Sequence, residues 1–146
     1  MKNDKKKGFT LVELIAVIAI LSILLMLALP QVLEMFRETR ESAFLTQVQY
    51  IYRAAEEQYV SDQLAPESGT TNITYCKDEA NTKTDDDLNL SNDDVQYKIV
   101  FTDGKITTFI VSDGNESLTV NAEEGQTVKI GNLTTPDTDL ATITCE

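Results

Sequence analysis

The sequence predicts an α+β fold in which one long N-terminal helix, half of it embedded in a membrane, packs on a C-terminal antiparallel sheet of about four strands. The helix is predicted by an almost uninterrupted apolar run at residues 9–29 and by apolar residues that continue at helical spacing to about residue 62. The sheet is predicted by alternating segments after Val95 that are divided by glycine-containing turns. With 146 residues, the chain has room for one modest domain besides this helix.

The apolar run reads FTLVELIAVIAILSILLMLAL, which is 21 residues. As a helix it would extend about 31 Å, close to the roughly 30 Å of a hydrocarbon core. Four lysines precede it, whereas the residues after Gly8 carry a net charge of −15. Because positive residues stay on the cytoplasmic side, we expect the N-terminus inside and the acidic body outside. A secretory signal peptide is the alternative, but the run is long for one and ends in a poor cleavage site.

One charged residue, Glu13, interrupts the apolar run. A carboxylate inside a membrane costs a few kcal/mol and therefore usually marks a function. The plainer interpretation is a tolerated charge near the interface, because Glu13 lies only five residues into the run.

The string KKKGFTLVEL at residues 5–14 resembles the prepilin leader and cleavage motif of type IV pilins and pseudopilins. The resemblance covers residues 5–32 and includes Pro30. It implies that a prepilin peptidase cleaves between Gly8 and Phe9, and that the new amino group of Phe9 is methylated. It also implies that Glu13 helps to recruit the subunit into a filament.

Cleavage would give Phe9 an ammonium group, whose reference pKa is about 7.7–8. In a filament, the Glu13 carboxylate of one subunit would pair with the Phe9 amine of its neighbour. An unpaired charge is costly in a low dielectric, and a paired one much less so. We therefore expect proteolysis to switch on packing in one register.

The helix is expected to continue as an amphipathic outer half at residues 30–62. Proline removes a backbone donor, so a bend is expected at Pro30. Apolar residues then recur at mostly helical spacing, and we expect the stripe from Phe36 to Tyr59 to pack on a sheet of its own subunit. Packing on a partner helix or in a coiled coil is the alternative. The members of the pattern are Leu33, Phe36, Phe44, Val48, Ile51, Ala55 and Tyr59.

Residues 63–146 are expected to form the extracellular body, beginning with an irregular connection to about residue 94. Strands are predicted at 95–102, 105–112, 116–121 and 126–131, in a meander whose first turn is Asp103-Gly104. The tail at 140–145 is predicted to be a short strand or a docked segment.

Cys76 and Cys145 would both lie outside the membrane, where oxidation persists, and we expect them to be bonded. Two free buried thiols are the alternative. The resemblance supports the pairing, since many pilins hold a C-terminal region with a disulfide.

The acidic segment at residues 85–94 suggests calcium, with Asp85, Asp87, Asn89 and Asp93 as candidate ligands. It departs from an EF-hand loop, because Leu90 and Gln96 stand where glycine and glutamate are required. A solvated loop is therefore the favoured interpretation, and no metal or other cofactor is expected.

The chain contains no histidine and none of the common catalytic motifs, so we expect no enzyme activity. Its acidic body disfavours direct nucleic-acid binding. The leader is expected at 1–8 and the membrane or filament-core helix at 9–29, in a precursor held in the cytoplasmic membrane.

We expect a structural subunit of a type IV pilus-like filament at the cell surface. The resemblance implies that its partners are identical subunits, the membrane, a prepilin peptidase, and an assembly platform protein with its ATPase. Such filaments serve adhesion, motility, DNA uptake and secretion. The alternatives are a pseudopilin of a secretion or competence machine, a minor priming subunit, and an anchored binding domain that never polymerises.

Overall fold

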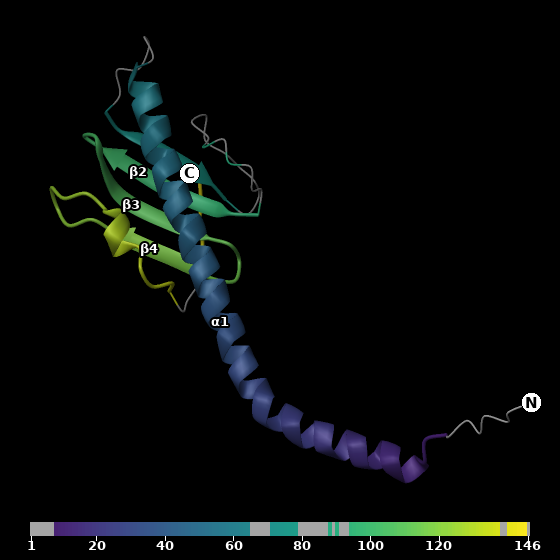
Figure 1. Cartoon of the computed structure of the whole chain (residues 1–146). Coiled ribbons are helices and arrows are strands. Elements are labelled where there is room, and N and C mark those ends of the chain that lie inside the picture. Colours follow the sequence, from purple (N-terminus) through teal and green to yellow (C-terminus); the bar gives the residue numbers. More distant parts are fainter. Residues whose placement is uncertain are drawn as a thin grey trace, which may run out of the picture. The chain divides into compact units, whose positions relative to one another are not determined.

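The computed structural model describes residues 8–64, 71–78, 88, 90, 94–137 and 140–145. The predicted α+β fold is confirmed: one long helix and a four-stranded antiparallel sheet (Figure 1). The chain divides into two compact units, one of residues 1–39 and one of residues 40–146. Its elements are α1 (Leu11–Leu64), β1 (Ile73–Lys77), β2 (Gln96–Thr102), β3 (Lys105–Ser112), β4 (Ser117–Asn121) and the 3-10 helix η1 (Ile130–Asn132).

Helix α1 is 54 residues long and contains Pro30 in its interior. Its bounds agree within two residues with the expected helix at 9–62. In the second unit, side chains on one stripe of α1 are buried against the sheet, at helical spacing. This stripe consists of Phe44, Val48, Ile51, Tyr52 and Ala55.

The expectation that the packed stripe begins at Phe36 is wrong, since that side chain is 62% exposed. Phe36 belongs to the first unit, whereas the buried stripe starts two turns later at Phe44. Helical spacing alone shows that residues share a face. It does not show how far along that face the sheet extends.

The sheet has the order β1-β2-β3-β4, with every neighbouring pair antiparallel. The predicted β2–β3 hairpin is confirmed. Its turn residues Asp103 and Gly104 both have positive φ, of 50° and 77°. This is the backbone of a type I′ turn, whose twist matches that of the flanking strands.

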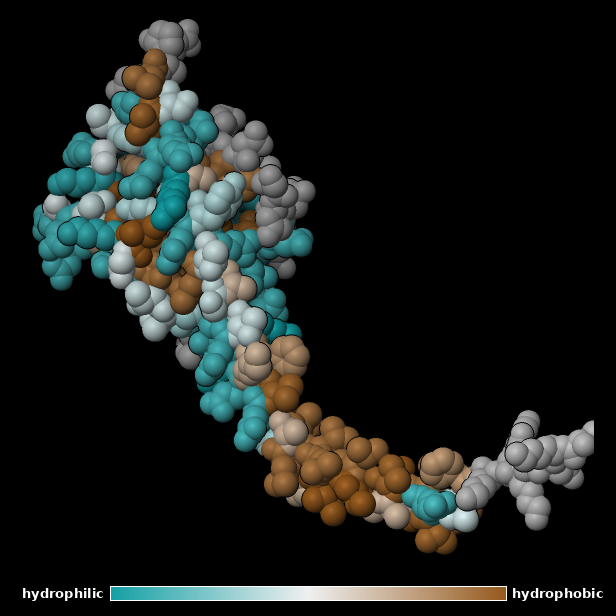
Figure 2. Space-filling view, in the orientation of Figure 1, coloured by the Kyte–Doolittle hydropathy of each residue, from teal (hydrophilic) through white to brown (hydrophobic). Residues whose placement is uncertain are grey.

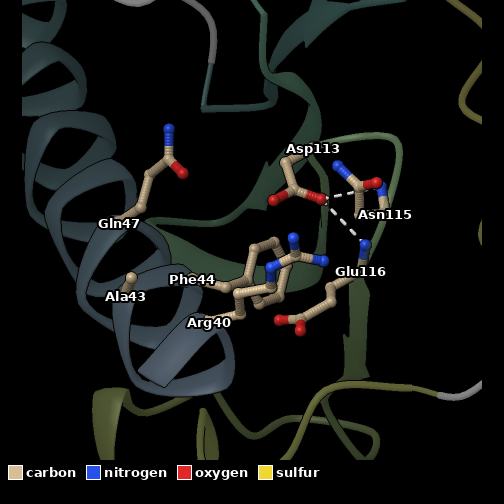
Figure 3. A pocket seen from close by; sticks show the side chains of 7 residues that line it. All are labelled: Arg40, Ala43, Phe44, Gln47, Asp113, Asn115 and Glu116. Carbon is tan, nitrogen blue, oxygen red and sulfur yellow. Dashed lines mark hydrogen bonds between the residues drawn. The ribbon is translucent and has the colours of Figure 1, made fainter. Parts of the chain in front are cut away.

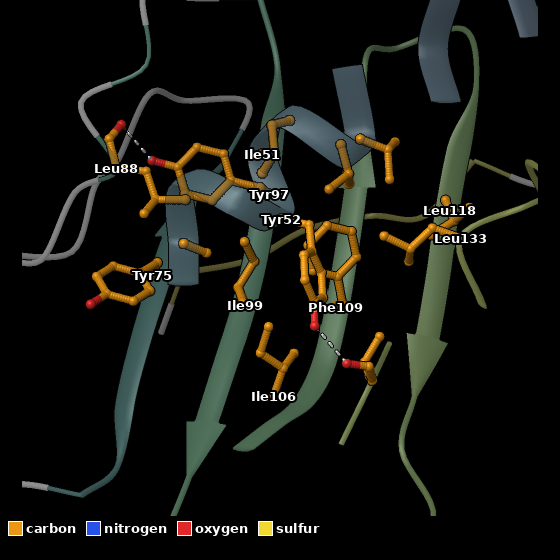
Figure 4. Packing of buried hydrophobic residues seen from close by; sticks show 14 of the residues in the cluster. Ile51, Tyr52, Tyr75, Leu88, Tyr97, Ile99, Ile106, Phe109, Leu118 and Leu133 are labelled. Atoms are coloured by element: carbon orange, nitrogen blue, oxygen red, sulfur yellow. Dashed lines mark hydrogen bonds between the residues drawn. The ribbon is translucent and has the colours of Figure 1, made fainter. Parts of the chain in front are cut away.

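Alternation along β2 buries Tyr97, Ile99 and Phe101 on the face that α1 covers. Figure 4 shows Tyr97 and Ile99 beside Tyr52 and Phe109 in one continuous core, and Phe101 belongs to the same cluster. The rings of Tyr52 and Phe109 lie 5.7 Å apart.

The Tyr52 hydroxyl donates a hydrogen bond of 2.9 Å to the Val128 carbonyl (Figure 4). Burial raises the pKa of this phenol to about 12, and the neighbouring Glu56 adds to the effect. The hydroxyl therefore stays protonated as a donor at any physiological pH.

One predicted strand is wrong and one real strand was missed. Residues 126–131 contribute a single backbone bond to β3, from the Val128 amide to the Ile106 carbonyl, before η1 begins. The apolar signal at this place comes from Val128, which fills one core position instead of extending along an edge. The strand that was missed is β1, which completes the four-stranded sheet and lies inside the segment that was expected to be irregular.

The C-terminal tail is a docked segment and not a strand, which settles the alternative left open by the sequence. Ile143 is buried, and the Lys98 ammonium donates to the Thr144 carbonyl at 3.0 Å. At one end of the tail, the Ala141 amide donates to the Ser117 hydroxyl of β4 at 3.2 Å, and Asp137, just before the tail, accepts from the Thr119 amide of β4. At the other, a disulfide joins Cys145 to Cys76 of β1. The tail is thus fastened to both edge strands of the sheet.

Candidate functional site: the N-terminal processing and assembly segment

The expected cleavage point, Gly8–Phe9, precedes the first turn of α1. Gly8 does not have a left-handed backbone, and a Cβ built on it would meet nothing within 4 Å. Phe9 is 88% exposed. The fold itself therefore does not require glycine at position 8, and any such requirement has to come from a partner that recognises this bond.

The start of α1 is a capping box formed by Thr10 and Glu13. The Glu13 Oε2 atom accepts from the Thr10 amide and from the Thr10 hydroxyl, both at 2.9 Å. The Glu13 amide in turn donates to the Thr10 hydroxyl oxygen at 3.3 Å. Reciprocal bonds of this kind satisfy helix donors that would otherwise lack partners.

The role of Thr10 was missed by the sequence reasoning, which considered only charged partners for Glu13. The spacing that signals a capping box, a threonine followed three residues later by a glutamate before an apolar run, is plain in the sequence. The structure thus brings Glu13 together with Thr10. The lysines of the leader lie outside the described residues.

The helix from Leu11 to Leu29 carries large apolar side chains that are all exposed, interrupted by Glu13. Figure 2 shows one face of this segment, which is mostly hydrophobic. An 18-residue stretch of α1 has a mean hydropathy of 2.9, and none of its residues is buried. By length and composition, α1 is the one helix in the described part of the chain that is suited to cross a membrane. A helix that is apolar all round needs lipid or other apolar surfaces around it.

Helix α1 continues through Pro30. Proline donates no hydrogen bond, so the carbonyl four residues earlier loses its helical partner. A bend at Pro30 remains a prediction.

The calcium candidates Asp85, Asp87, Asn89 and Asp93 lie outside the described residues. Among the described residues, no group of three or more carboxylate, cysteine or histidine side chains is placed to hold a metal ion. Calcium binding therefore stays a prediction of the sequence.

A long helix with an exposed apolar half, followed by a sheet-containing body, is consistent with a membrane-anchored precursor. Residues 3–29 match the family model described as "Prokaryotic N-terminal methylation motif". The resemblance to the leader and helix start of type IV pilins and pseudopilins is confirmed for this segment. No curated protein and no solved structure matches the chain. What is said of the chain beyond residue 29 therefore rests on its structure alone.

Proposed function

We propose that this chain is a structural subunit of a type IV pilus-like extracellular filament, polymerised through its N-terminal helix. The observation that carries the proposal is the methylation motif at residues 3–29 joined to an apolar helix surface that the chain leaves uncovered. Lipid covers that surface in the precursor, and the helices of other copies cover it in the filament. The same side chains thus serve both states.

Cleavage at Gly8–Phe9 and methylation of Phe9 prepare the subunit for assembly. In the capping box, both Thr10 bonds go to the Glu13 Oε2 atom. Within the described residues, no bond to the other oxygen, Oε1, occurs. The amine of a neighbouring Phe9 can therefore bind Oε1 while the helix start stays intact, and the capping box holds the carboxylate in place for it.

The neighbour's amine lowers the cost of the carboxylate in an apolar filament core, because a paired charge is much less costly there than an unpaired one. Uncleaved subunits offer an uncharged amide instead of an amine. They are therefore retained in the membrane until the peptidase has acted.

The partners of this function are the membrane, the prepilin peptidase, an assembly platform protein with its ATPase, and identical copies of the chain. The precursor lies in the cytoplasmic membrane with its body outside, and the mature chain is part of a surface filament. The chain catalyses no reaction itself. Because pseudopilins share the same motif, assembly into a short secretion or competence fibre is the second candidate.

The test is mass spectrometry of the mature N-terminus combined with electron microscopy of wild-type and deletion cells. We expect a chain that begins with methylated Phe9, and long surface fibres that vanish on deletion. Glu13→Ala should be processed normally but should not enter fibres. Fibres confined to a secretion or uptake machine would favour the pseudopilin, and a mature chain that begins with Met1 would contradict the proposal.

A further inference from the structure

A cavity of about 360 Å³ lies between α1 and the β3–β4 turn, within the second unit of the chain (Figure 3). Helix α1 lines it with Arg40, Ala43, Phe44 and Gln47, and the turn lines it with Asp113, Asn115 and Glu116. The buried ring of Phe44 forms an apolar part of this lining, which is otherwise mostly polar.

The turn that carries the acidic side of the cavity is held by its own hydrogen bonds. Asp113 Oδ1 accepts from the Asn115 and Glu116 amides, both at 2.8 Å (Figure 3). The Asp113 amide also donates to the Glu116 carbonyl at 3.1 Å. These bonds hold the backbone of the turn, from which the Glu116 side chain projects (Figure 3).

Glu116 has one carboxylate oxygen that the chain leaves unsatisfied. Its Oε2 atom is buried and has no hydrogen-bond partner within the described residues. Burial raises the pKa of Glu116, and the charges of Asp113 and Glu41 raise it further, whereas Arg40 acts in the opposite direction. Arg40 lines the same cavity, yet no ion pair joins it to Glu116. A second cation at this place would relieve the cost of the ionised carboxylate.

The body itself offers few cations to fill this role. Among the described residues after Arg40, two exposed basic side chains, those of Arg53 and Lys129, have no hydrogen bond or ion pair. Neither of them lines the cavity. Acceptor and donor thus occupy different surfaces of one chain, and contacts between different surfaces give open polymers instead of closed dimers.

We propose that the cavity lined by Phe44, Asp113 and Glu116 is a contact site between subunits, which receives an exposed basic side chain, Arg53 or Lys129, from a second copy of this chain. The inference rests on the proposed filament function, and it adds to the N-terminal helix a second, electrostatic contact between bodies. This contact sets which rotation and rise between neighbouring subunits is accepted.

Charge exchange in full-length chains tests the site. Glu116→Lys should lower the yield of sheared filaments at least about tenfold, since like charges then face each other across the contact. One of the two partner substitutions, Arg53→Glu or Lys129→Glu, should restore the yield when combined with Glu116→Lys. The matched control is Glu124→Lys, an exposed acid outside the cavity, which should assemble like wild type.

Three outcomes distinguish a failure of the contact site from a failure of the proposed function. Wild-type cells without any fibre would overturn the function itself. Wild-type fibres together with normal assembly of Glu116→Lys would overturn the contact site alone. Loss of assembly that neither partner substitution restores would also overturn it. Melting of each variant in detergent, where no filament forms, separates a misfolded body from a lost contact.

Discussion

Large apolar side chains are mostly buried in one unit of the molecule and exposed in the other. In the body, Ile99 and Phe109 are completely covered by the chain's own helix and strands. In the N-terminal unit, Ile23 and Leu27 are 63% and 69% exposed, and no polar face accompanies them. The body therefore completes its core alone, whereas the N-terminal helix depends on a surface supplied from outside the chain.

The polar groups of the two units differ in a similar way: those of the tail and turns of the body are bonded within the chain, and Glu13 of the N-terminal unit is bonded only in part. The body ties its tail to both sheet edges and its turns to themselves. The N-terminal unit has one carboxylate, Glu13, within its apolar segment, and Thr10 satisfies only one of its oxygens. The difference implies that changes in the N-terminal unit should alter assembly or processing and leave the fold intact, whereas changes in the buried core of the body should alter the fold itself.

The largest expected effect breaks processing without touching the fold. Gly8→Leu should abolish cleavage, because the open space around Gly8 shows that the chain itself tolerates a side chain there, whereas the peptidase has to accept one in its site. An immunoblot that separates precursor from mature chain measures the cleaved fraction. The denaturant midpoint of the body should be unchanged, and efficient cleavage of this variant would contradict the expectation.

The reverse effect comes from the centre of the core. Phe109→Ala should lower the free energy of unfolding of the body by about 3–5 kcal/mol, since it leaves a cavity beside Tyr52. Guanidinium unfolding of the full chain in detergent, followed by circular dichroism, gives this difference.

Leu27→Ala is the matched control, because it also shortens a large apolar side chain but in the exposed helix. Its unfolding free energy should stay within about 0.5 kcal/mol of wild type. An equal loss in both variants would mean that the two units do not differ as described.

A third change tests how the tail is held. Replacing both Cys76 and Cys145 by serine removes a link between residues 69 positions apart, and it should lower stability by about 4 kcal/mol through the entropy of the unfolded chain. Thermal melting with and without reductant checks the result. Reductant should destabilise wild type to the same level and leave the double variant unaffected.

Sequence reasoning succeeded where one signal decides a structure. The β2–β3 hairpin followed from Asp103-Gly104 between two alternating segments, because few other backbones fit such a turn. The N-terminal helix followed from the length of its apolar run. The leader motif was confirmed because it is local, specific and independent of the body.

The sequence predictions were wrong where the structure of a segment depends on contacts with distant parts of the chain. Strand β1 is only five residues long and lies among polar residues, and its place at the sheet edge depends on pairing with β2. Val128 is β-branched and lies in an alternating pattern typical of a strand, but its segment makes only one backbone bond to β3, from the Val128 amide to the Ile106 carbonyl. Phe36 has the spacing of a core residue, but it belongs to the other unit.

The smallest expected effect concerns Glu116 and the pH. Burial, Asp113 and Glu41 raise its pKa in the folded state, so the fold favours the protonated acid. This contribution to stability is fully present below the pKa of the unfolded chain, about 4.3, and is lost as the pH rises through the higher folded value. Glu116→Gln stays neutral, so it should melt slightly above wild type at pH 7, and the difference should shrink towards pH 4. Melting curves of monomers in detergent at several pH values measure this, with Glu124→Gln as the exposed control. A difference that grows as the pH falls would mean that the ionised carboxylate already has a stabilising partner within its own chain, and a cation from a second copy would then have nothing to relieve.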